Sequence, residues 1–174
     1  GGTWSTGDLT VTSTGVIRSS NSAGLSISPV GTVGTLDNAG TIETTRTGNV
    51  RPALVVNSGT VTLIKNQSIG FIQNNNNGIG IDNFSTITAI ENAGTITGSA
   101  YAIRNGASSI GTIFNSGIIQ GGYAIGNDLG TIATLTNIGS IYDIWGSSGS
   151  GGVISNISGT ITTFNNLQGG STPV

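Results

Sequence analysis

The chain has 174 residues, 30 of them glycine, and only 7% carry a charge, against about 25% in an average soluble domain. It contains no cysteine or histidine, which excludes disulfides, thiol nucleophiles, imidazole bases and Cys/His metal sites, so we expect no metal and no cofactor. The five Lys and Arg residues are scattered singly and the formal charge is −2, so we expect no nucleic-acid partner and no binding to anionic membranes.

The residue types predict a folded, β-rich chain. No apolar run approaches the ~20 residues of a membrane helix, and the first residues do not resemble a signal peptide, so we expect no direct membrane insertion of this segment. Disordered chains combine low hydrophobicity with high net charge, whereas this chain is 35% hydrophobic with a net charge of only −2, so we expect it to fold. Gly, Asn, Ser, Thr, Ile and Val dominate, which favours strands joined by many turns.

In chain order, the first segment fits the repeats described below least well. We interpret residues 1–12 as an irregular N-terminal start of a single domain that covers residues 1–174. Leu25–Ile27 and Val33–Leu36 fit the later strands, with Pro29 where an asparagine is expected.

From Leu36 onward the chain repeats a sequence motif: an aliphatic residue, any residue, Asn, a short turn often ending in Gly-Thr, then Ile or Val. The spacings of these asparagines alternate between long and short, so each unit of 22 to 29 residues has two different corners. The first-corner asparagines are Asn38, Asn66, Asn92, Asn115, Asn137 and Asn166. The second-corner asparagines are Asn57, Asn83, Asn105, Asn127 and Asn156.

A glycine bend divides the longer interval of each unit into two strands, and the shorter interval forms a third. Three strands and three corners per coil predict an all-β fold, a right-handed parallel β-helix (solenoid) of six to seven coils. The first inward column of aliphatic side chains is expected to contain Val61, Ile87, Ile110, Ile132 and Ile161. The second contains Leu36, Ile64, Ile90, Ile113, Leu135 and Phe164. The third contains Val55, Ile81, Ile103, Ile125 and Ile154.

The corner asparagines are interpreted as structural. Asn tolerates the left-handed conformation of a tight corner, and its amide can bond to the asparagine of the next coil, so we expect hydrogen-bonded ladders. The less favoured alternative is glycosylation, because Asn66, Asn83 and Asn156 each begin an acceptor sequence.

Five charged residues lie just before a corner asparagine, where the strand alternation points outward: Asp37, Lys65, Asp82, Glu91 and Arg104. We interpret Asp82 with Arg104, and Glu91 with Lys65, as exposed pairs on neighbouring coils that contribute ~1 kcal/mol or less. The competing interpretation makes Asp82 and Glu91 a pair of catalytic carboxylates, which would have to face one another across a cleft.

Two further patterns have a structural and a functional interpretation. Tyr101 and Tyr123 fall in one column with Leu25, Ala53 and Ile79, which favours packing over a platform for sugar stacking. Threonine pairs such as Thr60/Thr62 resemble the flat arrays of ice-binding β-helices, but the pattern is interrupted in later coils, so ice binding is a minor alternative.

Three insertions, at residues 43–52, 73–78 and 142–152, interrupt the same long interval and are expected on one edge of the solenoid. Loops on a rigid scaffold often carry function, and tolerated insertions without a role are the alternative. The candidate ligand-contact residues on this edge are Arg46, Arg51, Asn74, Asn75, Asn76, Asn77, Tyr142 and Trp145.

Asn92–Gly98 followed by Tyr101–Asn105, and Gly130–Ile141, resemble the repeats in passenger domains of bacterial autotransporters (type V secretion), such as pertactin-like β-helices. The resemblance covers residues 30–170 and is specific for architecture rather than activity. Family members also carry export and anchoring segments, so we expect this chain to be an excised passenger segment. The resemblance implies a Gram-negative surface or secreted protein, exported across the outer membrane.

The expected function is adhesion, as in virulence, or a structural stalk, without catalysis. The competing class is a glycan-processing β-helix enzyme, for which seven dispersed carboxylates supply no cluster. We expect a host-cell or surface glycan or protein receptor as partner. We also expect self-association through coil ends or strand edges, because their backbone groups are unpaired.

Overall fold

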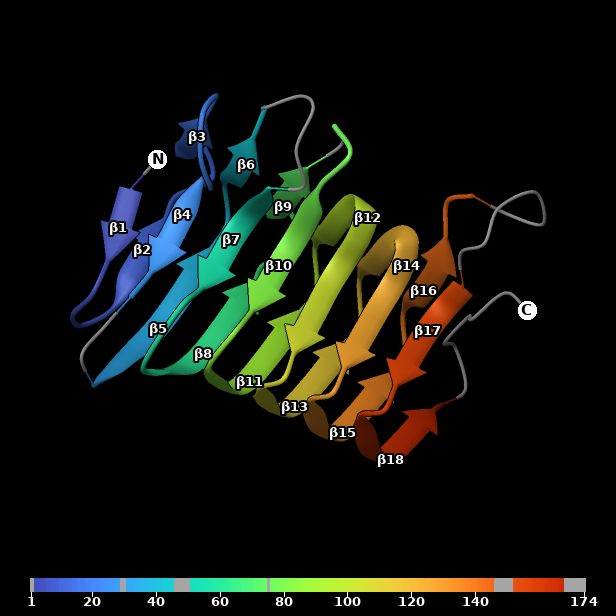
Figure 1. Ribbon diagram of the computed structural model, residues 1–174. Helices are drawn as coiled ribbons and strands as arrows, with labels where there is room; N and C mark the ends of the chain where they lie inside the picture. The colour runs from blue at the N-terminus through green and yellow to red at the C-terminus, as the bar shows by residue number, and fades with distance from the viewer. Residues whose placement is uncertain (1, 29–30, 46–50, 75, 146–151, 168–174) are drawn as a thin grey trace.

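The computed structural model describes residues 2–28, 31–45, 51–74, 76–145 and 152–167. Over these residues the protein is an all-β parallel solenoid of about six turns with three strands per coil (Figure 1). No helix in the described ranges is long and apolar enough to cross a membrane.

The strands stack into three faces, which we call faces A, B and C. Face A is the seven-stranded sheet of β2 (Leu9–Val11), β5 (Thr32–Asn38), β8 (Thr60–Asn66), β11 (Thr86–Asn92), β13 (Ser109–Asn115), β15 (Thr131–Asn137) and β18 (Thr160–Asn166). The eleven-stranded sheet bends into the other two faces, because β12 (Thr95–Gly106) and β14 (Ile118–Asp128) run through both. Face B contains their first halves with β3 (Val16–Ser19), β6 (Thr41–Thr44), β9 (Phe71–Asn74) and β16 (Ser140–Asp143). Face C contains their second halves with β1 (Gly2–Trp4), β4 (Leu25–Ile27), β7 (Pro52–Val56), β10 (Ile79–Asn83) and β17 (Gly152–Ile157).

The first two predicted aliphatic columns are confirmed in register along face A. Their side chains are almost completely buried in the inner coils, as for Ile87 and Ile90. Ile161 is half-buried and Phe164 is 46% exposed, because β18 is the last described strand of face A and pairs only with β15.

The third column was predicted wrongly at one position. Leu54, not Val55, pairs with Ile81, and Val55 pairs with Asp82 on the outer surface. Because β7 contains three consecutive aliphatic residues, the hydrophobic pattern does not distinguish this register from the predicted one. The shift also moves Val56 opposite Asn83, so Asn57 lies outside the stack.

The first-corner ladder is confirmed, because each amide donates to the amide oxygen of the next coil at 2.7–2.9 Å from Asn38 through Asn166. The second-corner ladder begins at Asn83 and continues to Asn156 with bonds of 2.7–2.8 Å. Asn57 was therefore wrongly assigned to it. Its place is taken by Val56, which is fully buried and pairs with Ile27 of the previous coil.

The ladder asparagines lie in strands, not in the left-handed conformation expected of them. At the second corner the left-handed residue comes two positions later, at Ala107, Leu129 and Ser158, with φ between 48° and 64°. The asparagine side chain instead holds the corner together, since Asn105 also donates to the carbonyl oxygen of Ser108 at 3.2 Å.

The first corner needs glycine for space rather than for a positive φ. A Cβ on Gly94 would lie 2.2 Å from the carbonyl oxygen of Gln67 and 2.3 Å from that of Gly70. Gly117 and Gly139 have equally close backbone neighbours in the coil before them. The stacked Asn-x-Gly corners therefore allow adjacent coils to approach without side chains between them.

The N-terminal residues, expected to be irregular, contain two strands. β1 pairs with β4 and β2 pairs with β5, so the solenoid begins before residue 12. Trp4 is 6% exposed and packs with the core of the first coils.

Candidate functional site

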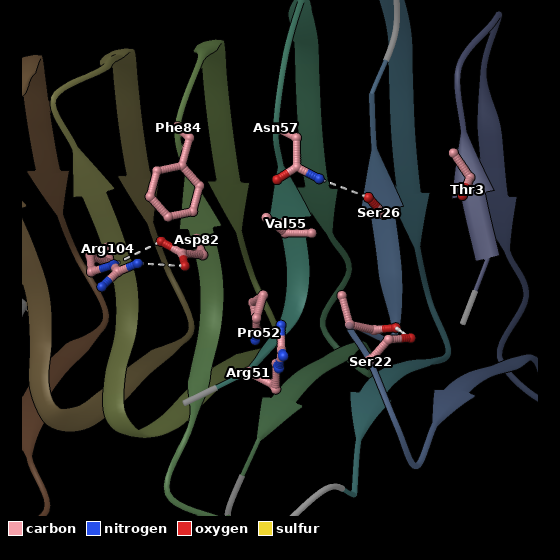
Figure 2. A pocket seen from close by; sticks show the side chains of 11 residues that line it. Thr3, Ser22, Ser26, Arg51, Pro52, Val55, Asn57, Asp82, Phe84 and Arg104 are labelled. Atoms are coloured by element: carbon pink, nitrogen blue, oxygen red, sulfur yellow. Dashed lines mark hydrogen bonds and ion pairs between the residues drawn. The ribbon is translucent and has the colours of Figure 1, made fainter. Parts of the chain in front are cut away.

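The outer surface of face C carries a groove of about 450 Å³, shown in Figure 2. Its floor is a column of outward residues, one from each of five successive coils. In register these are Thr3, Ser26, Val55, Asp82 and Arg104. The groove therefore runs along the solenoid axis, with a new side chain about every 4.8 Å.

At one end of the groove Arg104 and Asp82 form a bidentate ion pair, with both N···O distances 2.8 Å. The exposed fractions of the two side chains are 27% and 5%, so the prediction of an exposed pair is wrong. The Phe84 ring covers the Arg104 guanidinium, with its centroid 5.2 Å from Cζ. An outward position on face C is therefore not always exposed, since the Asp82 side chain is buried there.

Burial raises the pKa of the Asp82 carboxyl, because desolvation disfavours its charged form. The hydrogen bond from Arg104 and its positive charge act in the opposite direction, and the charge of Asp128 adds to the rise. Both Asp82 oxygens are bound to the guanidinium, so this carboxylate is fixed in place.

The other predicted charge pair does not form. Glu91 and Lys65 are in register on face A, yet the described residues contain no ion pair between them. Glu91 lies on β11 of face A and Asp82 on β10 of face C, so the two carboxylates do not face each other as a catalytic pair would.

Arg51, a predicted ligand-contact residue, lies on the rim of this groove. Its guanidinium points into the groove between Pro52 and Ser22 (Figure 2). The ion pairs among the described residues are Arg18–Glu43 and Arg104–Asp82, so Arg51 has no carboxylate within 4 Å in that part of the chain. Two arginines and one aspartate line the groove, which gives it a net positive charge in a chain of net −2.

Asn57 lies on the opposite rim from Arg51 (Figure 2). Its amide donates to the Ser26 hydroxyl at 2.9 Å and to the Ser28 hydroxyl at 3.3 Å. The groove therefore offers an amide and hydroxyl groups on one side and a guanidinium on the other.

An aromatic row continues along the surface beyond Arg104. Tyr101 stacks on Tyr123 with ring centroids 5.2 Å apart, and Tyr123 meets Trp145 edge-on at 6.2 Å. The Tyr101 ring lies over Gly126, where a Cβ would come within 2.5 Å of it. Burial raises the pKa of the Tyr101 hydroxyl, and the negative charge of Asp128 raises it further.

The column predicted for the tyrosines is confirmed for Ile79, Tyr101 and Tyr123, which pair in register. Ile79 pairs on its other side with Pro52 rather than with Ala53. Leu25 pairs instead with Leu54, one position away from Ala53 in β7. A register shift after Gly98 accompanies the bend between faces B and C. Both tyrosine rings are half-exposed, so they pack on the outer surface rather than in the core.

The strands that lead into the three insertions, β6, β9 and β16, lie in the same sheet on face B (Figure 1). Residues 46–50, 75 and 146–151 of these insertions lie outside the described residues. Arg46 and Asn75 lie outside the described residues. Asn74 is fully buried and structural: its amide donates to the Arg51 carbonyl oxygen, and its oxygen accepts the Asn76 backbone N–H at 2.8 Å. Asn77 is exposed and left-handed, with φ 61°.

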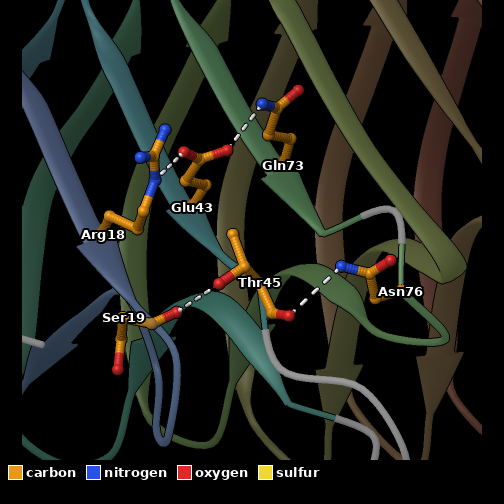
Figure 3. Close-up of polar contacts among 6 residues, drawn as sticks. All are labelled: Arg18, Ser19, Glu43, Thr45, Gln73 and Asn76. Atoms are coloured by element: carbon orange, nitrogen blue, oxygen red, sulfur yellow. Dashed lines mark hydrogen bonds and ion pairs between the residues drawn. The ribbon is translucent and has the colours of Figure 1, made fainter.

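Figure 3 shows that Asn76 reaches across to the preceding insertion, where it donates to the Thr45 carbonyl oxygen at 3.3 Å. Beside it the outward residues of face B bond to one another, with Glu43 between Arg18 and Gln73. These residues hold the edge together.

Tyr142 and Trp145 lie farther along the solenoid than Arg51. The Tyr142 hydroxyl donates to Gln120 on face B, and a Cβ on Gly122 would lie 2.5 Å from the Trp145 ring. Among the described candidate residues, Arg51 is the one that lines the groove, and Tyr142 and Trp145 lie away from it.

Sequence reasoning missed Ser26, Val55 and Phe84 as groove residues. The position just before a corner asparagine identifies Asp82 and Arg104 as outward residues. Ser26 and Val55 are not directly followed by an asparagine, so this signal could not have found them. The described residues contain no group of three or more carboxylates suited to a metal ion.

Comparison of the chain with models of known protein families, with curated proteins and with solved structures gives no significant match.

Proposed function

We propose that the chain is a non-catalytic passenger segment of a bacterial autotransporter, displayed at the cell surface or secreted, that acts in adhesion or as a structural stalk. A parallel solenoid with stacked Asn-x-Gly corners supports the proposal, because this is the architecture that the repeat resemblance implies. In such a fold each coil contacts only its neighbours, which suits a chain that folds progressively after export.

The observation that favours binding over catalysis is the state of Asp82. It is the one carboxylate that lines the groove among the described residues, and Arg104 holds both of its oxygens at 2.8 Å. A general acid or base must reach a reacting atom within hydrogen-bond distance. A carboxylate held in this way leaves the groove with groups that bind rather than react.

Binding and turnover measured separately on a panel of polysaccharides test the proposal. We expect some glycans to bind to the purified chain without any new reducing ends, and beads coated with the chain to attach to cells that display those glycans. Product formation would contradict the non-catalytic role. Absence of both glycan binding and cell attachment would contradict the adhesive role, and the role of a structural stalk would remain.

The alternative is a fragment of a glycan-processing enzyme, and one observation favours it. Burial raises the pKa of Asp82 above its ordinary value, and a raised carboxyl pKa is typical of a general acid. If the panel reveals turnover, Asp82→Asn should abolish it while leaving binding intact.

Ice binding is the minor alternative, supported by one row of hydroxyl side chains on face A. Residues in register along this row are Thr32, Thr60, Thr86, Ser109, Thr131 and Thr160. Thermal hysteresis of the purified chain measures this activity directly.

A further inference from the structure

We infer that the groove on face C binds an acidic oligosaccharide, with Arg51 contacting a sugar carboxylate. The inference rests on the proposed adhesive function and adds to it the ligand class and the residue that selects it. It draws on three properties of the groove, which are its charge, its lining and its shape.

The charge of the groove selects an anion. Arg104 is neutralised by Asp82, whereas Arg51 is exposed, has no carboxylate within 4 Å among the described residues, and points into the groove. A planar guanidinium binds a carboxylate through two parallel hydrogen bonds. A nucleic acid is disfavoured, because one available cation cannot neutralise a run of phosphates.

The lining of the groove matches a sugar. A pyranose ring carries hydroxyl groups at its rim and C–H groups on its faces, so it needs hydrogen-bonding side chains next to an apolar surface. Asn57 on one rim and Ser26 on the floor supply an amide and a hydroxyl group, and the Phe84 ring, 49% exposed, supplies an aromatic face. Val55 and Pro52 add apolar surface between them.

The shape of the groove suits a chain rather than a single small molecule. Its volume of about 450 Å³ is within the range of ligand sites, about 300–1,000 Å³. It is lined by residues of five successive coils, from Thr3 on β1 to Arg104 on β12, so it is elongated along the solenoid. An oligosaccharide lying along this axis would meet Arg51 and Asn57 on opposite sides.

Isothermal titration of the purified chain with matched acidic and neutral probes tests the inference. Trigalacturonate is compared with its methyl ester, and sialyllactose with its methyl ester, so each pair differs in the charge of the carboxyl groups and the two pairs separate uronate chains from sialylated glycans as the source of the carboxylate. We expect at least one acidic probe to bind at least about tenfold more tightly than its neutral partner, because a charge-assisted hydrogen bond is lost with the carboxylate. The difference should shrink as salt is raised.

Arg51→Gln is the decisive variant. It should weaken binding of the acidic probe about tenfold or more, leave the neutral probe unchanged, and leave the melting temperature unchanged because Arg51 is exposed. Lys65→Gln removes one positive charge from face A and serves as the matched control, which should bind both probes as the wild type does.

Equal binding of acidic and neutral probes, or an Arg51→Gln variant with wild-type affinity, would overturn the inference and leave adhesion standing. Failure of every probe to bind at millimolar concentration would also overturn it, with the stalk role remaining. Turnover of an acidic probe that depends on Arg51 would instead support the ligand class and contradict the non-catalytic function.

Discussion

At the scale of single residues, the Asp82–Arg104 pair shows that the sequence can predict which residues pair without predicting how deeply the pair is buried. Its partners and register follow from the spacing of the asparagines, but its burial follows from neighbours on other coils. Phe84 covers the guanidinium, and Asp82 is only 3% exposed. The sequence predicts that this pair contributes ~1 kcal/mol or less to stability, as exposed ion pairs do. In the structure the removal of one partner would instead leave a buried, unpaired charge.

Arg104→Gln should destabilise the fold by about 3 kcal/mol at pH 7.5. The pKa of Asp82 is raised above its ordinary value of 3.8 in the folded state, so the folded protein holds this proton more firmly than the unfolded chain does. The contribution of Asp82 to stability is therefore most favourable below pH 3.8 and declines as pH rises through the folded pKa. Removing Arg104 raises that pKa further, so the decline should extend to higher pH.

Urea denaturation between pH 4 and pH 8 measures this effect. The cost of Arg104→Gln should be smallest at pH 4, where Asp82 is most readily protonated, and largest at pH 8. Lys65→Gln is the control, since Lys65 forms no ion pair among the described residues. An equal cost of Arg104→Gln at both ends of the range would show that Asp82 is not the group responsible.

At the scale of elements, the asparagine ladders join strands of adjacent coils. Asn92 accepts from Asn66 at 2.8 Å and donates to Asn115 at 2.7 Å, and it also donates to the carbonyl oxygens of Gly94 and Ile118. It is 1% exposed, so each of these groups depends on it rather than on water. One side chain thus connects three coils.

Asn92→Ala should cost about 3 kcal/mol of unfolding free energy, because it leaves buried acceptors without a donor. Asn57→Ala, at an exposed residue that the sequence placed in a ladder by mistake, should cost about 0.5 kcal/mol or less. Chemical denaturation followed by circular dichroism compares the two variants. Similar midpoints for both would contradict the assignment of Asn92 to the ladder and of Asn57 to the surface.

The repeat made most of face A predictable, because hydrophobic residues lie two and five positions before each first-corner asparagine and these offsets determine which residues stack. The prediction of the second corner was wrong in the coil of β7. An insertion precedes this strand, and Leu54, Val55 and Val56 are similarly hydrophobic, so the sequence pattern does not fix their register. The groove had no local motif, since each floor residue comes from a different coil. Asp82 and Arg104 were predicted as an outward pair, and Arg51 was the one described groove residue predicted to contact a ligand, from its place in an insertion.

At the scale of the whole molecule, the coils form a nearly one-dimensional array. Each strand of face A pairs only with the strands of the coils on either side of it. Inner coils are therefore covered on both sides, whereas every described residue of β18 is exposed or half-buried. Stability should follow this difference, because residues in the same column have different amounts of surface to lose.

The column that contains Ile110 and Ile161 offers a matched test of this idea. The two side chains have the same identity and the same position in their strands, but Ile110 is 1% exposed and Ile161 is half-buried in the last coil. Ile110→Ala should cost about 3 kcal/mol, through lost burial and a cavity, and Ile161→Ala about 1 kcal/mol or less. Urea denaturation of the two variants measures the difference. Equal costs would mean that the last coil is covered in solution, for instance by a second copy of the chain, and the mass of the particle by light scattering would then identify the cover.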